Sequence, residues 1–162
     1  MKFEPGKKRY NDYPTFFKTL FQERVQKLSI DGGFTCPNRD GSKGVGGCSF
    51  CNNESFNPGY CRAVRGITEQ IDEGIHFFAR KYNGQRYLAY FQAYSNTYAP
   101  LDVLKQRYEE ALAHPMISGL VVGTRPDVVN EEILDYLGGL AQRYYVCVEY
   151  GVAWISIQRL LY

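Results

Sequence analysis

The feature that most constrains the fold is a regular alternation of strand-like and helix-like segments. Short apolar runs predict four strands, KLSID at 27–31, YLAYFQ at 87–92, GLVVGT at 119–124 and YVCVEY at 145–150. Between them, apolar residues recur at helical spacing over 67–82, from 101 to 112 and over 131–143. GLVVGT is apolar without interruption, as expected of a strand buried on both faces. The alternation predicts an α/β fold with a parallel sheet and right-handed crossovers.

Length and charge narrow the class of protein. The chain has 162 residues with 44% hydrophobic content, enough for one domain with a sizeable core. Its net charge of +2 comes from interspersed basic and acidic residues, so no strong field favours nucleic acid or an anionic membrane. No apolar run approaches the roughly 18–20 residues that span a bilayer. We therefore expect a cytoplasmic protein without a membrane partner.

Ahead of the first strand, residues 1–26 form an aromatic-rich segment. Phe16, Phe17, Leu20 and Phe21 recur at helical spacing and predict a short amphipathic helix.

Polar and reactive residues gather where the predicted strands end. In open parallel sheets, reactive loops leave the carboxyl ends of the strands, which share one edge. We therefore expect one edge to collect the cysteine-containing loop, the polar residues after the next two strands, and the end of the fourth strand: Tyr94, Ser95, Asn96, Thr97, Thr124, Arg125, Pro126, Asp127, Glu149 and Gly151.

The loop after the first strand carries Cys36, Cys48 and Cys51 with Cys-x11-Cys-x2-Cys spacing among several glycines. Thiols clustered in this way in a reducing compartment indicate metal or redox chemistry rather than disulfides. Three thiolates on one loop can close around a metal centre and leave one coordination position open. An iron–sulfur cluster with three cysteine ligands has such a position.

A closed structural zinc site is the alternative, with Cys61 as the fourth ligand. It would make the protein a non-enzymatic zinc-binding module. The spacing is less typical of zinc, because zinc ribbons usually bring two Cys-x2-Cys pairs together and only one is present. His76 and His114 fall in predicted helical stretches remote from the loop, and Cys147 is expected to be a small buried hydrophobic residue.

The block KLSIDGGFTCPNRDGSKGVGGCSFCNN resembles the cluster-binding segment of radical S-adenosylmethionine proteins. The resemblance is specifically to the YhcC-like branch related to the catalytic subunit of Elongator, which also has a long first cysteine spacing. The match continues in order through FQAYSNTYAP, GTRPD and VEYG and covers 27–151. It implies that this range is a radical S-adenosylmethionine core, the first four β/α units of a partial TIM-type barrel.

The resemblance also implies cofactors and their ligands. Cys36, Cys48 and Cys51 would hold a [4Fe-4S] cluster, and S-adenosylmethionine would chelate the open iron through its amino and carboxylate groups. The resemblance places Phe50 near the adenine, Glu149 near the ribose, and Gln92, Tyr94 and Asn96 near the methionine moiety. The implied activity is reductive cleavage of S-adenosylmethionine to a 5′-deoxyadenosyl radical, with the cofactor carrying the chemistry and no acid, base or nucleophile required of the protein.

Partners follow from the same resemblance. An electron donor such as flavodoxin or ferredoxin would reduce the cluster. The kinship with Elongator suggests RNA as a substrate, but the near-neutral charge gives RNA no independent support.

The chain departs from the resemblance after Gly151. Residues 152–162 match nothing expected after the glutamate block, and we interpret them as an atypical tail on a core truncated after its fourth strand. Such a chain is expected to bind a cluster but to have little or no turnover. A third hypothesis is that the chain is an inert fragment.

Overall fold

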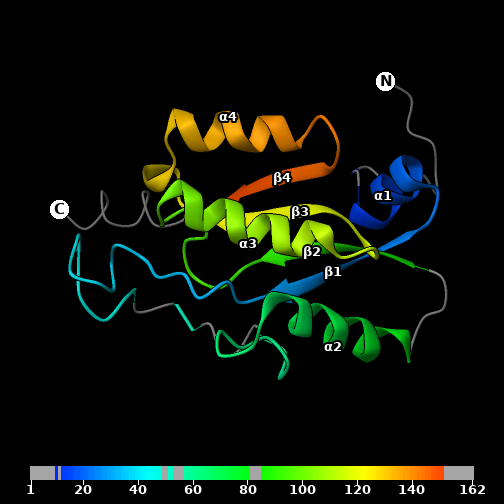
Figure 1. The fold of residues 1–162 in the computed structure, drawn as a ribbon, viewed down its shortest axis with the longest axis horizontal. Coiled ribbons are helices and arrows are strands. Elements are labelled where there is room, and N and C mark those ends of the chain that lie inside the picture. Colours follow the sequence, from blue (N-terminus) through cyan, green and yellow to red (C-terminus); the bar gives the residue numbers. More distant parts are fainter. Residues whose placement is uncertain (1–9, 11, 49–50, 53–56, 81–84, 152–162) are drawn as a thin grey trace.

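The computed structural model describes residues 10, 12–48, 51–52, 57–80 and 85–151. Its centre is a four-stranded sheet in the order β1-β2-β3-β4, and every neighbouring pair is parallel (Figure 1). The strands are β1 (Arg24–Ile30), β2 (Gln85–Phe91), β3 (Ile117–Thr124) and β4 (Tyr145–Tyr150). The helices are α1 (Tyr13–Phe21), α2 (Ile67–Ala79), α3 (Leu101–Ala113) and α4 (Glu131–Leu140), with a short 3-10 helix η2 (Pro126–Val128) after β3. The predicted α/β fold with a parallel sheet is confirmed.

Helices cover both faces of this sheet. The larger core lies between the sheet and the crossover helices α2, α3 and α4, with Leu28, Phe91 and Val122 from the strands packed against Ile71 and Tyr108. These five side chains are completely buried. Consecutive strand residues point to opposite faces, so Leu88 and Val121 face the other way, where they pack against Phe17 of α1. Both faces of the two central strands are therefore apolar, which accounts for their long hydrophobic runs.

Helix boundaries follow local chemistry. Asp12 caps α1 by accepting a 2.9 Å hydrogen bond from the backbone nitrogen of Thr15, and Asn130 caps α4 in the same way through Ile133. Helix α1 ends at Phe21, and its C-cap Gln22 has a left-handed φ of 57°.

Several element boundaries differ from the sequence-based ones. Strand β1 begins at Arg24 rather than at Lys27, because Arg24–Gln26 continue the register with β2. Helix α2 ends at Ala79 rather than 82, and α4 ends at Leu140 rather than 143. Cys147 is half-buried rather than buried, because the outer strand β4 is less covered than β2 and β3.

The predicted atypical tail, 152–162, lies outside the described residues. In the part of the chain that is described, no helix is both long and apolar enough to cross a membrane.

The sheet leaves no room for a side chain at Gly119. A Cβ atom there would collide with the backbone carbonyl of Tyr145 on β4, which cannot move without breaking the strand pairing. We predict that Gly119→Ala lowers the free energy of unfolding by at least about 2 kcal/mol, as overpacking does. Chemical denaturation followed by circular dichroism measures this.

Gly138 provides the matched control. It lies exposed in α4 with nothing within 4 Å of a built Cβ. Gly138→Ala should raise the free energy of unfolding by about 0.5–1 kcal/mol through helix propensity. Equal effects of the two substitutions would contradict the packing described for β3 and β4.

Candidate cysteine site at the carboxyl edge of the sheet

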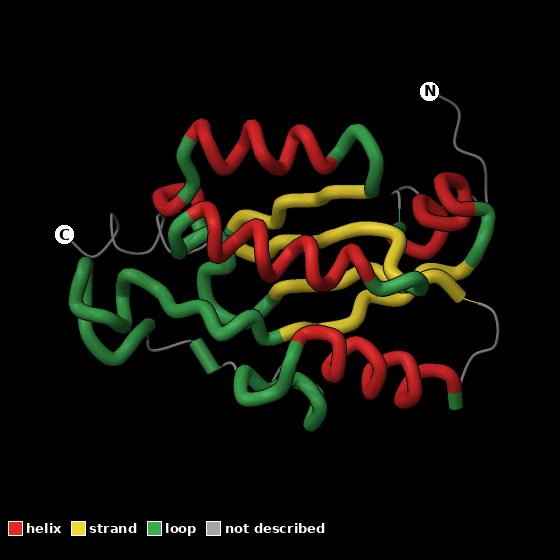
Figure 2. Tube along the Cα trace, in the orientation of Figure 1, coloured by secondary structure: helices red, strands yellow, loops and turns green. Residues whose placement is uncertain are grey.

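A long loop leaves the carboxyl end of β1 (Figure 2). Cys36, Cys48 and Cys51 belong to this loop. Its first residue is fixed by Gln70 of α2, a completely buried amide. The Gln70 side chain accepts from the Asp31 nitrogen at 2.9 Å and donates to the Asp31 carbonyl at 3.0 Å. Further along, the Ser95 nitrogen after β2 donates to the Thr35 carbonyl at 3.2 Å. The loop therefore starts in a defined direction, along the edge where all four strands end.

Tight turns bring the three cysteines together. The Arg39 nitrogen bonds to the Cys36 carbonyl at 2.8 Å, the Gly47 nitrogen to the Asn38 carbonyl at 2.9 Å, and the Cys51 nitrogen to the Cys48 carbonyl at 2.9 Å. Gly46 and Gly47 have φ values of 82° and 89°, a conformation that side chains disfavour, so the turn before Cys48 requires glycine.

All three thiols line one cavity of about 240 Å³ at this edge. Its remaining lining comes from the same loop and from the ends of β2, β3 and β4: Arg39, Gly47, Tyr94, Ser95, Thr124, Arg125, Pro126, Asp127 and Gly151. The expectation that one edge collects the polar and reactive residues holds for most of them.

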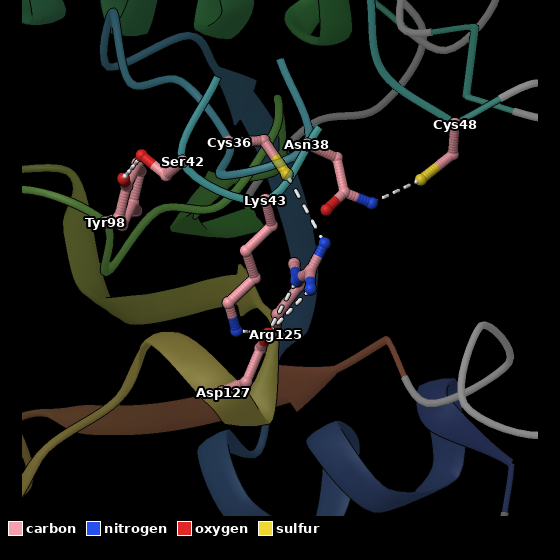
Figure 3. Close-up of polar contacts among 8 residues, drawn as sticks. All are labelled: Cys36, Asn38, Ser42, Lys43, Cys48, Tyr98, Arg125 and Asp127. Atoms are coloured by element: carbon pink, nitrogen blue, oxygen red, sulfur yellow. Dashed lines mark hydrogen bonds and ion pairs between the residues drawn. The ribbon is translucent and has the colours of Figure 1, made fainter. Parts of the chain in front are cut away.

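Cys36 lies beside the guanidinium of Arg125, which follows β3 (Figure 3). The Arg125 Nη1 to Cys36 Sγ distance is 3.8 Å. The other side of the guanidinium binds Asp127 through Nε at 2.8 Å and Nη2 at 2.6 Å. Asp127 also pairs with Lys43 of the cysteine loop at 2.5 Å. The hydrogen bonds from Arg125 hold the pKa of the Asp127 carboxyl well below its usual range, so it is ionised at neutral pH.

The other two sulfurs also have polar neighbours. The Asn38 Nδ2 donates to Cys48 Sγ at 3.1 Å (Figure 3). Desolvation raises the pKa of the Cys51 thiol, with a further rise from Cys48 and Cys36, while the positive charge of Arg39 opposes the rise. Cys51 is thus close enough to both Cys36 and Cys48 to be affected by their charge.

Cys61 lies apart from this group. It is 3% exposed and lines a different cavity with Asp31, Asn57 and Arg62. Burial raises the pKa of its thiol to about 12, so it is a neutral thiol at physiological pH. Across the described residues, no three His, Cys, Asp or Glu side chains converge closely enough to hold a single metal ion.

The structure locates the other residues implied by the resemblance as follows. Tyr94 lines the cysteine cavity with a φ of 63°, and the Arg39 guanidinium lies 4.7 Å from its ring centroid. Gln92 is half-buried just after β2 and is not among the cavity residues. Phe50 lies outside the described residues.

Asn96 is completely buried and ties the ends of two strands together. Its Nδ2 donates to the backbone carbonyls of Phe91 at 3.0 Å and Gly123 at 2.7 Å, and the backbone carbonyl of Asn96 accepts from the Tyr108 hydroxyl. These bonds close the carboxyl ends of β2 and β3, so in this structure Asn96 shapes the edge beneath the cavity and does not line it.

Glu149 lies near the end of β4, and its side chain is directed to the α1 face of the sheet. It accepts from Lys27 Nζ at 2.5 Å and from the Tyr13 hydroxyl at 3.1 Å. Burial opposes ionisation, but the hydrogen bonds from Lys27 and Tyr90 prevail and lower the pKa of the carboxyl. Glu149 is therefore an ion-pair partner on the sheet and lies outside the cysteine cavity lining.

Sequence reasoning assigned no role to Asn38, Arg39, Lys43, Arg125 or Asp127. Arg125 and Asp127 were noted at a strand end, and that position was the available signal. Their partners could not be inferred, because the contacts of Arg125 with Cys36 and of Asp127 with Lys43 depend on the path of an irregular loop.

The chain is similar to several curated proteins. It is 44% identical over 133 residues to protein YhcC of Escherichia coli (strain K12), a match that covers 82% of this chain and 42% of that protein. It is 36% identical over 145 residues to the uncharacterized protein YtqA of Bacillus subtilis (strain 168), covering 90% and 45% of the two chains. To the uncharacterized protein MJ0486 of Methanocaldococcus jannaschii it is 30% identical over 146 residues, covering 88% and 44%.

The chain therefore spans less than half the length of these curated relatives. No protein-family model matches the sequence. No solved structure matches it either.

The hydrogen bonds of Asn96 predict a structural role that mutation can test. Asn96→Ala would remove the side-chain donor shared by the Phe91 and Gly123 carbonyls, although Gly123 would keep its 3.2 Å bond from the Asn96 backbone nitrogen. We expect the free energy of unfolding to fall by about 1–3 kcal/mol. Chemical denaturation measures the loss. Asn130→Ala removes only the N-terminal cap of α4 and serves as the control. It should lower the free energy of unfolding by about 1 kcal/mol. A smaller loss for Asn96→Ala than for Asn130→Ala would contradict the role described.

Proposed function

We propose that this chain binds a [4Fe-4S] cluster through Cys36, Cys48 and Cys51 and holds S-adenosylmethionine at the remaining iron. The observation that carries the proposal is that these three thiols line one cavity at the carboxyl edge of a parallel sheet while Cys61 lies elsewhere. The sequence resemblance to radical S-adenosylmethionine proteins supports it from a separate direction.

The arrangement of the thiols fits a cluster better than a single ion. In a cubane each cysteine binds a different iron, so three thiolates need to surround a space without meeting at one point. The cavity of about 240 Å³ is many times larger than the roughly 10–15 Å³ that a cavity needs on the same measure to hold one water molecule. A tetrahedral zinc site would instead need Cys61 to converge with the other three, and Cys61 is buried among other residues.

The chemistry that such a centre supplies when bound is reductive cleavage of S-adenosylmethionine to a 5′-deoxyadenosyl radical. The chain's own residues would position and shield it. Asn38 and Arg125 contact two of the sulfurs, Arg39 and Tyr94 form a wall of the cavity, and Asn96 fixes the sheet edge beneath. Hydrogen bonds and charge around cluster sulfurs tune their reduction potential.

The rest of the proposal concerns the longer relatives, which the chain matches over less than half of their length. We propose that the four β/α units form part of a partial barrel, as in radical S-adenosylmethionine enzymes, and that the part of the relatives outside the match supplies more of the wall. The substrate and the electron donor, such as a flavodoxin or ferredoxin, belong to that complete unit.

Cysteine substitutions test the ligand set. After anaerobic reconstitution with iron and sulfide, the chain should hold about four irons with broad brown absorbance. Replacement of Cys36, Cys48 or Cys51 by Ala should lower the iron content several-fold. Each of these cysteines is one of the three protein ligands, and two ligands are too few to retain the cluster.

Cys61→Ala is the matched control, and it should keep the iron content of the unmodified chain because Cys61 lies in a separate cavity. Loss of the metal in Cys61→Ala, or stoichiometric zinc that survives oxygen in place of iron, would favour the closed zinc site instead.

A further inference from the structure

Arg125 is held so that one edge of its guanidinium faces the cysteine cavity. Asp127 takes Nε and Nη2 at 2.8 and 2.6 Å, a two-point contact that fixes the plane of the group. This contact leaves Nη1 directed at Cys36 Sγ, 3.8 Å away (Figure 3). The Arg125 side chain is 14% exposed. Its charge is therefore only partly screened by water.

Asp127 connects this arginine to the cysteine loop itself. Lys43 reaches Asp127 from the loop, and the neighbouring Ser42 hydroxyl lies 2.8 Å from the Tyr98 hydroxyl (Figure 3). The loop that carries Cys36 and the segment that carries Arg125 are thus joined at the same carboxylate. Lys43, Asp127 and Arg125 together carry one net positive charge, and Arg125 is the member that contacts the sulfur.

We propose that Arg125 is a positioning residue that orients Cys36 and raises the reduction potential of the metal centre held by the three cysteines. The inference rests on the proposed cluster and deepens it by assigning a control of its potential. A positive charge and an N–H donor beside a coordinating sulfur stabilise the more negative, reduced state of a centre. Arginine suits this position because it can bind a carboxylate with two nitrogens and present a third elsewhere, which lysine cannot do.

A merely structural alternative is that the arginine only ties the loop to the end of β3. If Arg125 only joined the loop to β3, its replacement would lower the stability of the protein and the amount of iron bound. The reduction potential would then not depend on the charge at this position. The midpoint potential of the reconstituted protein separates these two roles, and iron content measured in the same samples reports on the tie.

The experiment is a redox titration, monitored by electron paramagnetic resonance, of the anaerobically reconstituted 162-residue chain and three variants. In Arg125→Gln we expect a lower potential, with about a tenfold smaller ratio of reduced to oxidised centre at a fixed applied potential, equivalent to about 59 mV for one electron. Arg125→Lys keeps the positive charge but cannot bind Asp127 with two nitrogens while a third faces Cys36. Its potential should fall between those of Arg125→Gln and the unmodified chain. Arg143→Gln removes an exposed arginine that stacks on Tyr144 and should leave the potential unchanged.

Each outcome decides a different point. A potential in Arg125→Gln equal to that of the unmodified chain, at equal iron content, overturns the inference and leaves the cluster proposal intact. An equal shift in Arg143→Gln also overturns it, because the effect would then be one of net charge. If Arg125→Gln does not fold, the potential of Arg125→Lys decides alone. A potential equal to that of the unmodified chain then overturns the role given to the guanidinium, which binds Asp127 with two nitrogens and presents a third to Cys36. Failure of the unmodified chain to bind iron overturns both proposals.

Discussion

The parallel alignment of the four strands is the constraint on which the rest of the structure depends. Because every neighbouring pair is parallel, each connection returns through a helix and each strand ends at the same edge. Residues far apart in sequence, such as Cys36, Tyr94 and Arg125, therefore line one cavity. The buried core between the sheet and its crossover helices keeps this edge in place.

Where the structure describes it, the cysteine loop has little regular secondary structure, and a few polar contacts determine its path. Gln70 fixes its start through Asp31, and Lys43 ties its middle to Asp127. These contacts place a loop of many glycines against a rigid sheet edge. Functional groups carried by loops on a rigid scaffold are a common arrangement, because the scaffold limits the motion of the side chains that bind a ligand.

Periodicity in the sequence was enough to predict the strands, the helices and their parallel order, because both faces of the sheet are buried and the apolar pattern is strong. Boundaries were less predictable where polar residues continue an element, as at Arg24 in β1. Strand alternation also explains why Glu149 does not line the cysteine cavity. The Glu149 side chain lies on the α1 face of the sheet, where it pairs with Lys27. The contacts of Arg125 and Asn38 with sulfur were beyond prediction, because they depend on turns whose geometry no periodic pattern encodes.

Cys36, Cys48 and Cys51 are proposed to hold a cluster whose remaining iron is open to S-adenosylmethionine. Electron paramagnetic resonance of the reduced, reconstituted chain before and after addition of S-adenosylmethionine tests this proposal most directly. We expect a cluster signal whose g values change on adding S-adenosylmethionine and stay unchanged with adenosine, which lacks the amino and carboxylate groups of the methionine part. A cluster signal that S-adenosylmethionine leaves unaltered would contradict the open coordination site.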